Sequence, residues 1–438
     1  MTELSGWGRY PVVEGMERAS ENFEAATASA ALSRGLGRSY GDASLPASPA
    51  DVVANSRRAD RILGFDPGSG VLRAEAGLSL RDLNRVFLRR GWASPVSPGT
   101  QYVTLGGMVA SDVHGGNHHV AGTFGEHVRS LRMRVADGRV LEVSEQTEPE
   151  LFRATLGGMG LTGHILEVEL KMERIPSAWL YTETRRVADI DDLVETLLES
   201  SRRWPMTKTW FDSTQRGPGM GRGFAVMGRW AEAGEAPPQP PLLRERLSVP
   251  PLPIGLVNAL TVSVFNKLWF HSQSRPRAAI AHPQAFFWPL DGLLHWNRLY
   301  GPRGFAQYQC VLPIERDTRV VRRFFAIMTR RGCPSPVSVI KDCGAEGRGL
   351  LSFPKPGISI ALDVPLRGER TQALVDALNE IVLEAGGRVY MAKDVLTRGT
   401  HFRAMEPRLP HFLEVRRKWD PERRLRSALS VRLLGDDV

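Results

Sequence analysis

The feature that most constrains this chain is a glycine-rich loop near its start, Arg34-Gly35-Leu36-Gly37-Arg38-Ser39-Tyr40-Gly41-Asp42. Its glycines allow successive backbone N–H groups to point toward one side, and Ser39 adds a hydroxyl donor. Such a nest of donors suits a diphosphate. Taken alone, the loop is equally compatible with ordinary turn chemistry.

Two further segments of the same region favour an extended ligand. The loop Pro98-Gly99-Thr100 precedes residues 103–110, where small side chains would allow a flat ring or a ribityl chain to lie against the backbone. Two loops suited to anions in one domain predict a dinucleotide. The third segment, Asp112-Val113-His114-Gly115-Gly116-Asn117-His118-His119, contains three histidines. Because His118 and His119 would point to opposite sides of an extended chain, and no carboxylate or thiol completes a ligand set, we predict contacts with a ring or ribityl chain and no metal site.

A literal G-x-G-x-x-G occurs from Gly158 to Gly163, but its context excludes a Rossmann site. That motif requires the order strand, loop, helix, so that the diphosphate meets a helix N-terminus. Here residues 150–156 have the pattern of a helix and residues 166–172 alternate like a strand. The order is therefore reversed, and the segment is interpreted as a tight turn.

Hydrophobic periodicity outlines the remaining elements. It predicts a hairpin over residues 62–76, a helix that begins after Ser79 and ends at Gly91, a helix over 371–385 and a strand over 388–392. The region from about 176 to 387 is richer in Trp, Phe and Pro. We therefore expect three parts: a first domain over 1–176, a second domain over 177–387, and a segment over 388–438 that returns to the first.

Composition and charge exclude several classes of protein. The chain has 438 residues and a formal charge of +9, but its basic residues are dispersed, which argues for a solvated surface and against nucleic acid. Only the tail from Arg416 to Arg426 gathers cations, a weak indication of an anionic membrane face or a phosphorylated substrate. Cys310, Cys333 and Cys343 show no metal spacing and fit reduced, structural thiols. With no secretory signal at its start, the chain is expected in the cytoplasm.

The most apolar segment, residues 249–270, is broken by prolines and polar residues, so it cannot form a clean membrane-spanning helix. We interpret it as a wall of the protein interior. The alternative is that it dips into a membrane interface.

Taken together and in this order, the loops resemble the FAD-binding domain of the vanillyl-alcohol-oxidase (PCMH-type) family. Within that family the resemblance is to the branch that oxidises a decaprenyl-phosphate-linked ribose at C2, and it runs nearly end to end. The motifs that carry it are Gly6 to Arg9, Arg34 to Asp42, Asp112 to His119, Phe124-Gly125, His127 to Ser130, Gly160 to Gly163, Trp210 to Asp212, Trp296 to Arg298, Tyr300 to Pro302, Gln307 to Gln309, Leu351 to Pro354 and Ala392 to Asp394.

This resemblance implies an α+β fold in which a two-part FAD-binding domain adjoins a substrate domain with an antiparallel sheet flanked by helices. It also implies that Arg38 occupies the position at which many relatives tether FAD through a histidine, so that FAD is bound noncovalently. The residues implied for FAD are Ser33, Arg34, Gly35, Leu36, Gly37, Arg38, Ser39, Tyr40, Gly41, Asp42, Ala43, Gly99, Thr104, Leu105, Gly106, Gly107, His114, Gly115, Gly116, Asn117, Ile165 and Tyr390.

On the substrate side the resemblance implies that Trp210, Gln307, Gln309 and Lys341 contact the sugar or its phosphate. By pattern alone, Gln307 and Gln309 also fit a strand with outward polar residues. At three further positions of the implied pocket this chain has Phe287, Ser359 and Ala361 where the family branch has tyrosine, asparagine and cysteine. These replacements remove polar groups, which leaves the sugar and the lipid chain open.

Lys393 is the candidate catalytic residue. Oxidation of an alcohol by a flavin leaves negative charge on the ring, and a cation beside it lowers the barrier. The chain contains only seven lysines among its 57 basic residues, so a lysine after the returning strand is informative, although a surface lysine is the alternative. The general base is open, with His114 as a candidate.

The predicted function is therefore FAD-dependent oxidation of the C2 hydroxyl of a polyprenyl-phosphate-linked pentose to the keto sugar. This would be the first half of a 2-epimerisation in cell-wall arabinan biosynthesis, completed by a short-chain dehydrogenase/reductase partner, with peripheral contact at the inner membrane face. The alternative enzyme is a soluble oxidase of free alditols or aldonolactones that uses oxygen. A third hypothesis, a basic phosphate- or nucleic-acid-binding module, requires that the protein lack flavin.

Overall fold

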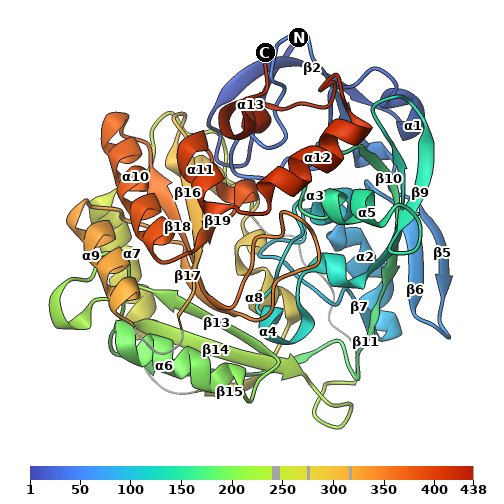
Figure 1. The fold of residues 1–438 in the computed structure, drawn as a ribbon. Coiled ribbons are helices and arrows are strands. Elements are labelled where there is room, and N and C mark those ends of the chain that lie inside the picture. Colours follow the sequence, from blue (N-terminus) through green and yellow to red (C-terminus); the bar gives the residue numbers. More distant parts are fainter. Residues whose placement is uncertain (239–246, 274–276, 315–317, 438) are drawn as a thin grey trace.

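The computed structural model describes residues 1–238, 247–273, 277–314 and 318–437, and Figure 1 shows their arrangement. Two larger sheets form most of the N-terminal part, beside a short pair of β7 (Trp92–Ala93) and β11 (Glu173–Arg174). The first has the order β1-β2-β4-β3 and the second β5-β6-β10-β8-β9. Their strands are β1 (Thr2–Ser5), β2 (Val12–Ala19), β3 (Leu32–Arg34), β4 (Val52–Asn55), β5 (Ile62–Asp66), β6 (Val71–Glu75), β8 (Val128–Arg134), β9 (Val140–Ser144) and β10 (His164–Lys171).

Local elements of this part follow the sequence patterns. The hairpin β5–β6 is antiparallel, and α2 (Leu80–Phe87) begins after Ser79, whose hydroxyl accepts a hydrogen bond from Asp82 N at 3.1 Å. Gly91, with φ 75°, ends the following turn. The segment after α5 (Pro149–Thr155) turns into β10, which confirms the order helix, loop, strand and the exclusion of a Rossmann site.

The larger sheet has eight strands, all paired antiparallel, in the order β15-β12-β14-β13-β17-β18-β16-β19. One face packs against helices, since Phe211 contacts Phe325 and the Tyr308 hydroxyl donates to Asn379. Figure 1 shows α6 (Ile190–Ser201), α9 (Arg319–Arg330) and α10 (Glu369–Glu384) along the outside of this sheet. The strands are β12 (Leu180–Val187), β13 (Met206–Phe211), β14 (Gly223–Trp230), β15 (Arg277–Ala281), β16 (Phe305–Leu312), β17 (Ser338–Cys343), β18 (Gly357–Pro365) and β19 (Arg388–Val389).

This arrangement confirms the predicted α+β fold with an antiparallel sheet flanked by helices. We propose that the boundaries between the domains lie at residues 176 and 387. The predicted strand over 388–392 is shorter than expected, because β19 pairs with the edge of β16 through two residues only. The chain then turns at Met391–Lys393, and Ala392 O accepts a hydrogen bond from Tyr40 N at 2.9 Å, which joins this turn to the glycine-rich loop.

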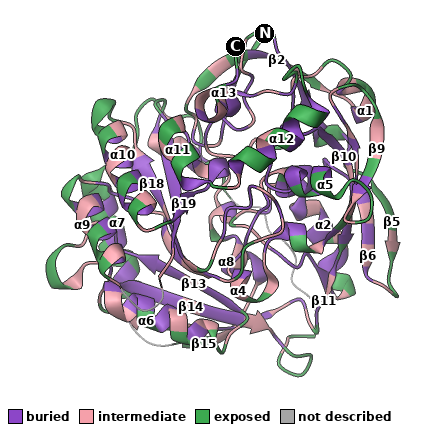
Figure 2. Cartoon of the chain, viewed as in Figure 1, coloured by how far each residue is buried: buried purple, intermediate pink, exposed green. Residues whose placement is uncertain are grey.

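The interpretation of residues 249–270 as an interior wall is wrong. The segment forms an extended approach and then α7 (Ala259–Ser272), which buries only Val262, Asn266 and Phe270. These residues lie four apart, so they form a single inward stripe. The apolar residues Leu260, Val264, Phe265, Leu268 and Trp269 are exposed on the other sides. Figure 2 shows the mixture of exposed and buried positions along the helices that surround the sheet. Among the described helices, none is long and apolar enough to cross a bilayer.

The C-terminal segment forms α11 (Gly399–Met405), α12 (Leu409–Trp419) and α13 (Ala428–Leu434), and both chain ends lie at the top of the view in Figure 1. Part of the basic tail is used inside the protein, since Arg416 forms a buried ion pair with Asp436 at 2.6 Å. Arg432 of α13 joins Asp42 of the glycine-rich loop and Asp394 of the turn after β19, both at 2.7 Å. One guanidinium therefore holds three distant segments together.

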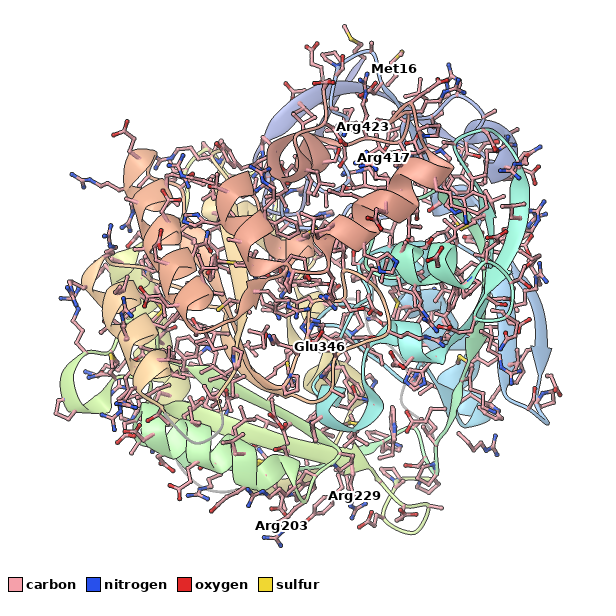
Figure 3. All side chains as sticks on the ribbon, in the orientation of Figure 1. Met16, Arg203, Arg229, Glu346, Arg417 and Arg423 are labelled. Atoms are coloured by element: carbon pink, nitrogen blue, oxygen red, sulfur yellow. The ribbon has the colours of Figure 1, made fainter. Side chains whose placement is uncertain are left out.

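We predict that Arg432→Met lowers the free energy of unfolding by about 3–5 kcal/mol, because the buried carboxylates of Asp42 and Asp394 lose their counter-charge. Chemical denaturation followed by fluorescence measures the change. Arg417→Met is the matched control, since Arg417 is an exposed arginine of α12, labelled in Figure 3. Equal stability of the two variants would contradict the role given to Arg432.

Candidate active site

A cavity of about 730 Å³ lies between the glycine-rich loop and the face of the eight-stranded sheet opposite its helices. Side chains alternate along a strand, so one face of each strand reaches the cavity and the other the helices. One row of paired residues crosses four neighbouring strands on this face. It consists of Trp210 on β13, Val339 on β17, Ala361 on β18 and Gln309 on β16. Lys341 and Ser359 form the next row on the same face.

The residues predicted for FAD divide into two groups. Most of them line the cavity: Ser33, Arg34, Gly35, Leu36, Gly37, Arg38, Ser39, Tyr40, Ala43, Gly99, Thr104, Gly106, Gly107, His114, Ile165 and Tyr390. The others lie behind this lining: Gly41, Asp42, Leu105, Gly115, Gly116 and Asn117. Asn117 donates to Pro95 O at 2.7 Å, and Gly116 O accepts from Thr207 N of β13. This second group shapes the loops through backbone packing.

The glycine-rich loop is held in a form that excludes a side chain at two of its positions. A Cβ on Gly35 would lie 2.2 Å from Thr104 Oγ1, and Gly37 has φ 63°, in the left-handed region. Arg34 fixes the loop from behind by donating to Ser5 O at 2.7 Å. Thr104 in turn caps α3 (Leu105–Ala110), since its Oγ1 accepts from Gly107 N. Backbone of two loops therefore forms a continuous wall of the cavity.

Arg38 is held by aromatic and backbone contacts. Its guanidinium carbon lies 3.8 Å from the centroid of the Trp7 ring, and Nε donates to Tyr102 O at 3.2 Å. Nearby, Asp291 accepts from Thr100 Oγ1 at 2.7 Å and from Gln101 N at 2.8 Å, so the Pro98–Thr100 loop is tied to the second half of the chain. Sequence analysis missed Asp291, which no motif marks.

The three histidines of the third segment turn to different partners. His114 Nε2 lies 2.8 Å from Gln309 Nε2, His118 Nδ1 accepts from Gly344 N at 3.0 Å, and His119 Nε2 lies 2.9 Å from Trp204 O. Over the described ranges, no three His, Cys, Asp or Glu residues are placed to hold a metal ion. Each of the three histidines therefore makes its own contacts with a different part of the protein.

The tautomer of His114 is assigned by its neighbour. Gln309 Nε2 donates to Ser359 Oγ at 2.7 Å and also faces His114 Nε2, which therefore accepts, and the proton lies on Nδ1. Nδ1 is buried and has no hydrogen-bond partner in the described part of the chain. Burial lowers the pKa of His114 well below its usual value, and Lys341 adds to this effect. The ring is thus neutral, with one donor available to a bound group.

All the residues predicted for the substrate line the cavity: Trp210, Phe287, Gln307, Gln309, Lys341, Ser359 and Ala361. Gln307 Nε2 donates to Asp363 Oδ1 at 2.6 Å, and the Tyr300 hydroxyl donates to Asp363 Oδ2 at 2.5 Å. Burial raises the pKa of Asp363 to about 6. The Gln307 carbonyl oxygen has no partner among the described residues, so it is a free acceptor in the pocket wall.

Lys393 also lines the cavity, with Nζ 5.4 Å from the centroid of the Tyr40 ring. Burial and the Lys341 ammonium lower the pKa of Lys393 to about 7, against the opposing effect of Asp363. A second lysine, Lys208 of β13, lines the same cavity, and burial with Lys341 lowers its pKa to about 7. Sequence analysis missed Lys208, although the scarcity of lysine and the alternation of β13 were available as indications.

Glycine loops packed closely together, a cavity beside an antiparallel sheet and buried lysines with a lowered pKa fit an FAD-dependent oxidoreductase of the PCMH type. Comparison with known proteins agrees. Residues 24–144 match the FAD binding domain family. The chain is 34% identical to decaprenylphosphoryl-beta-D-ribose oxidase of Mycolicibacterium smegmatis over 98% of this chain and 97% of that protein. It therefore belongs to the family of that oxidase.

Other relatives match in whole or in part. An uncharacterized protein of Streptomyces coelicolor is 34% identical over 81% of this chain and 100% of its own length. A putative D-arabinono-1,4-lactone oxidase of Neurospora crassa is 30% identical over 28% of this chain and 23% of its own. The likeness to lactone oxidases is therefore confined to a part of the chain.

The cavity fits FAD on two structural observations. Because Gly35 has no Cβ, it packs directly on Thr104 and leaves backbone in the cavity wall, where a diphosphate can be bound. The buried Nδ1 of His114 lacks a protein partner in the described ranges, so it is a donor left for a bound group.

We predict that Gly35→Ala lowers the affinity for FAD at least about tenfold, because the added Cβ displaces Thr104 and deforms two loops of the cavity wall. The measurement is the FAD released on acid precipitation per mole of protein, with circular dichroism as the test of folding. Gly234→Ala is the control, since a Cβ there meets nothing within 4 Å. Full FAD content in folded Gly35→Ala would refute this prediction.

Proposed function

We propose that this enzyme oxidises the C2 hydroxyl of a polyprenyl-phosphate-linked pentose to the keto sugar, the first half of a 2-epimerisation. The observation that carries the proposal is the convergence of Gln307, Gln309, Lys341 and Lys393 on one cavity beside the glycine-rich loop. Amide donors and acceptors suit sugar hydroxyls, and ammonium groups suit a phosphate. The relative that is 34% identical over 98% of this chain is named as a decaprenylphosphoryl-beta-D-ribose oxidase.

The residues proposed to hold FAD are the cavity-lining members of residues 33–43, 99–107 and His114, with Ile165 and Tyr390. Arg38 stands where a tethering histidine would be expected, and its guanidinium is engaged with Trp7 and Tyr102. An arginine forms no such covalent bond, so noncovalent binding is proposed. When bound, FAD supplies the electron acceptor: its ring takes two electrons and the hydrogen from C2, and gains negative charge.

Lys393 is proposed as the base of this reaction. As the C2–H and O–H bonds break and the C=O bond forms, the hydroxyl proton passes to Lys393 Nζ. With a pKa lowered to about 7, Nζ is partly neutral at pH 7 and can accept it. The resulting ammonium then offsets the negative charge that remains in the pocket. His114 is the weaker candidate, because its Nε2 already accepts from Gln309 and nearby lysines oppose a second proton.

The replacements in the pocket favour one alternative, oxidation of free alditols or aldonolactones with oxygen. Phe287, Ser359 and Ala361 line the cavity with fewer polar groups than the lipid-linked branch of the family is expected to present. Hydrogen peroxide formed from a free sugar would favour this alternative. A keto product would instead require a partner reductase, for which a short-chain dehydrogenase/reductase is proposed.

We predict that Lys393→Ala retains bound flavin but lowers the rate of substrate-driven flavin bleaching about 10²–10⁴-fold, the range for loss of a general base. Stopped-flow absorbance under anaerobic conditions, with a prenyl-phosphoryl pentose, measures the rate. In the wild type the rate should rise as pH passes about 7, because Nζ becomes neutral.

Lys393→Arg should not restore activity, since a guanidinium stays protonated. Lys418→Ala, a change at an exposed lysine, is the control. Unimpaired bleaching in Lys393→Ala would refute the assignment.

We also propose that α7 docks on an anionic membrane surface, in keeping with a lipid-linked substrate and a position at the inner membrane face. Leu260 and Leu268 are 74% and 68% exposed, and Lys267 lies between them in sequence. Phe265 and Trp269 belong both to this exposed face and to the lining of the cavity. The apolar face is therefore continuous with the substrate pocket, and its cation suits acidic headgroups.

For this surface we expect that Leu260→Gln with Leu268→Gln reduces binding to vesicles of phosphatidylglycerol and phosphatidylcholine at least about tenfold, because two exposed leucines no longer enter the interface. Sedimentation of the holoprotein with vesicles measures the binding. Leu63→Gln, a change at an exposed leucine of β5, is the matched control. Undiminished sedimentation of the double variant would rule out docking through α7.

A further inference from the structure

Lys208 and Lys341 are cross-strand neighbours on the cavity face of the large sheet. The register pairs Thr209 with Ile340 and Trp210 with Val339, and Lys208 and Lys341 are the next residues of β13 and β17 beyond these pairs, both in the cavity lining. Lys341 is paired in turn with Ser359 of β18. Like charges directly opposite each other on a sheet are destabilising, so this pair opposes folding.

Acidic neighbours do not compensate the pair. Among the described residues, neither Lys208 nor Lys341 forms an ion pair with a carboxylate, although many arginines of this chain do. Lys208 Nζ donates to Phe286 O and lies 4.5 Å from the centroid of the Phe286 ring. Burial lowers the pKa of both lysines. Two buried lysines that lack a carboxylate partner and face one cavity are expected where a bound anion supplies the missing negative charge.

The position of the pair within the cavity indicates which anion. Neighbouring strands lie about 4.8 Å apart, so β17, which carries Lys341, and β13, which carries Lys208, lie roughly 10 and 14 Å across the sheet from β16, which carries Gln309. Beyond Lys208, on β14, come the apolar Phe224 and Val226. Trp269 of α7 packs on Phe224 with ring centroids 5.9 Å apart.

Across the sheet, the cavity thus changes from amide groups to a pair of cations and then to an apolar mouth. A prenyl-phosphoryl sugar has the same order of chemistry, from hydroxyls through a phosphodiester to hydrocarbon. If the sugar hydroxyls of such a substrate lie at Gln309 and its prenyl chain lies at Trp269, its phosphodiester lies at Lys208 and Lys341.

We propose that Lys208 and Lys341 together form a phosphate subsite that binds the anionic phosphodiester of the substrate between the sugar pocket and the apolar mouth. This inference rests on the proposed function, since it assigns a part of the same substrate. Lys208 acts in binding and specificity, while Lys393 serves the chemistry.

The test is a set of binding titrations with the holoprotein in a Lys393→Ala background, so that no oxidation accompanies binding. The probes are a methyl-phosphoryl pentose, a prenyl-phosphoryl pentose with a short prenyl chain, and the neutral methyl pentoside. Isothermal titration calorimetry measures the dissociation constants. Lys208→Met and Lys341→Met are each expected to weaken both phosphodiesters at least about tenfold and the neutral pentoside less than about twofold, because a charge-assisted hydrogen bond is lost only with the anion.

Two controls make the result specific. Lys418→Met makes the same change at an exposed lysine and should alter none of the constants. Lys208→Arg keeps the charge and should restore most of the binding of the phosphodiesters. Equal tightness of the methyl and prenyl phosphodiesters would support a subsite for phosphorylated sugars in general, and tighter binding of the prenyl compound a subsite for the lipid-linked substrate.

The proposal is overturned if Lys208→Met weakens the neutral pentoside as much as the phosphodiesters, or if the protein binds the phosphodiester no tighter than the pentoside. Both outcomes are read from binding titrations in the Lys393→Ala background, so they do not depend on whether the sugar is oxidised. Failure of the proposed function would instead be seen as bound flavin that no sugar bleaches in the protein with Lys393 intact, whatever the titrations give.

Discussion

The antiparallel register of the eight-stranded sheet is the constraint on which the rest of the site depends. Because side chains alternate, pairing of β13, β17, β18 and β16 decides at once which residues meet the cavity and which meet the helices. A slip of one residue in β16 would turn Gln307 and Gln309 toward α10 and Tyr308 into the cavity. The hydrogen bond from Tyr308 to Asn379 opposes that slip. The same strand register thus determines both the packing of the sheet against its helices and the residues that line the cavity.

Positively charged side chains outnumber negatively charged ones in the lining of the cavity. Lys208, Lys341 and Lys393 face it, and the neutral His114 is kept from protonation by burial and by two of them. The nearest compensation for Lys393 is Asp363, which is shared with Tyr300 and Gln307. Such an excess of positive charge costs stability in the free protein, but it suits a reaction that places negative charge on a flavin and the phosphate of the proposed substrate. Elsewhere, by contrast, buried cations such as Arg416 and Arg432 are paired with carboxylates.

Helices, strands and turns were predictable wherever the residues that stabilise them lie within the same short segment. The hairpin β5–β6, the cap at Ser79 and the turn at Gly91 each depend on residues within a few positions of one another. Prediction failed where the partner was distant. The apolar composition of α7 indicated a buried segment, but only one stripe of it meets the sheet. Likewise, β19 is short because the chain turns at Met391–Lys393, where Ala392 O accepts a hydrogen bond from Tyr40 N of the distant glycine-rich loop.

The sequence by itself determined the class of cofactor and most of the residues that the structure brings to the cavity, because glycine spacing and strand alternation are local properties that a chain displays without folding. Tertiary structure alone decided three things: that Lys208 stands beside Lys341, that Asp291 ties the Pro98–Thr100 loop to the second half of the chain, and that the apolar face of α7 continues into the cavity. Each joins residues more than a hundred positions apart or from separate elements. The reason is physical, since a charge or an apolar side chain acquires its role from what lies within a few ångströms of it, and folding sets that distance.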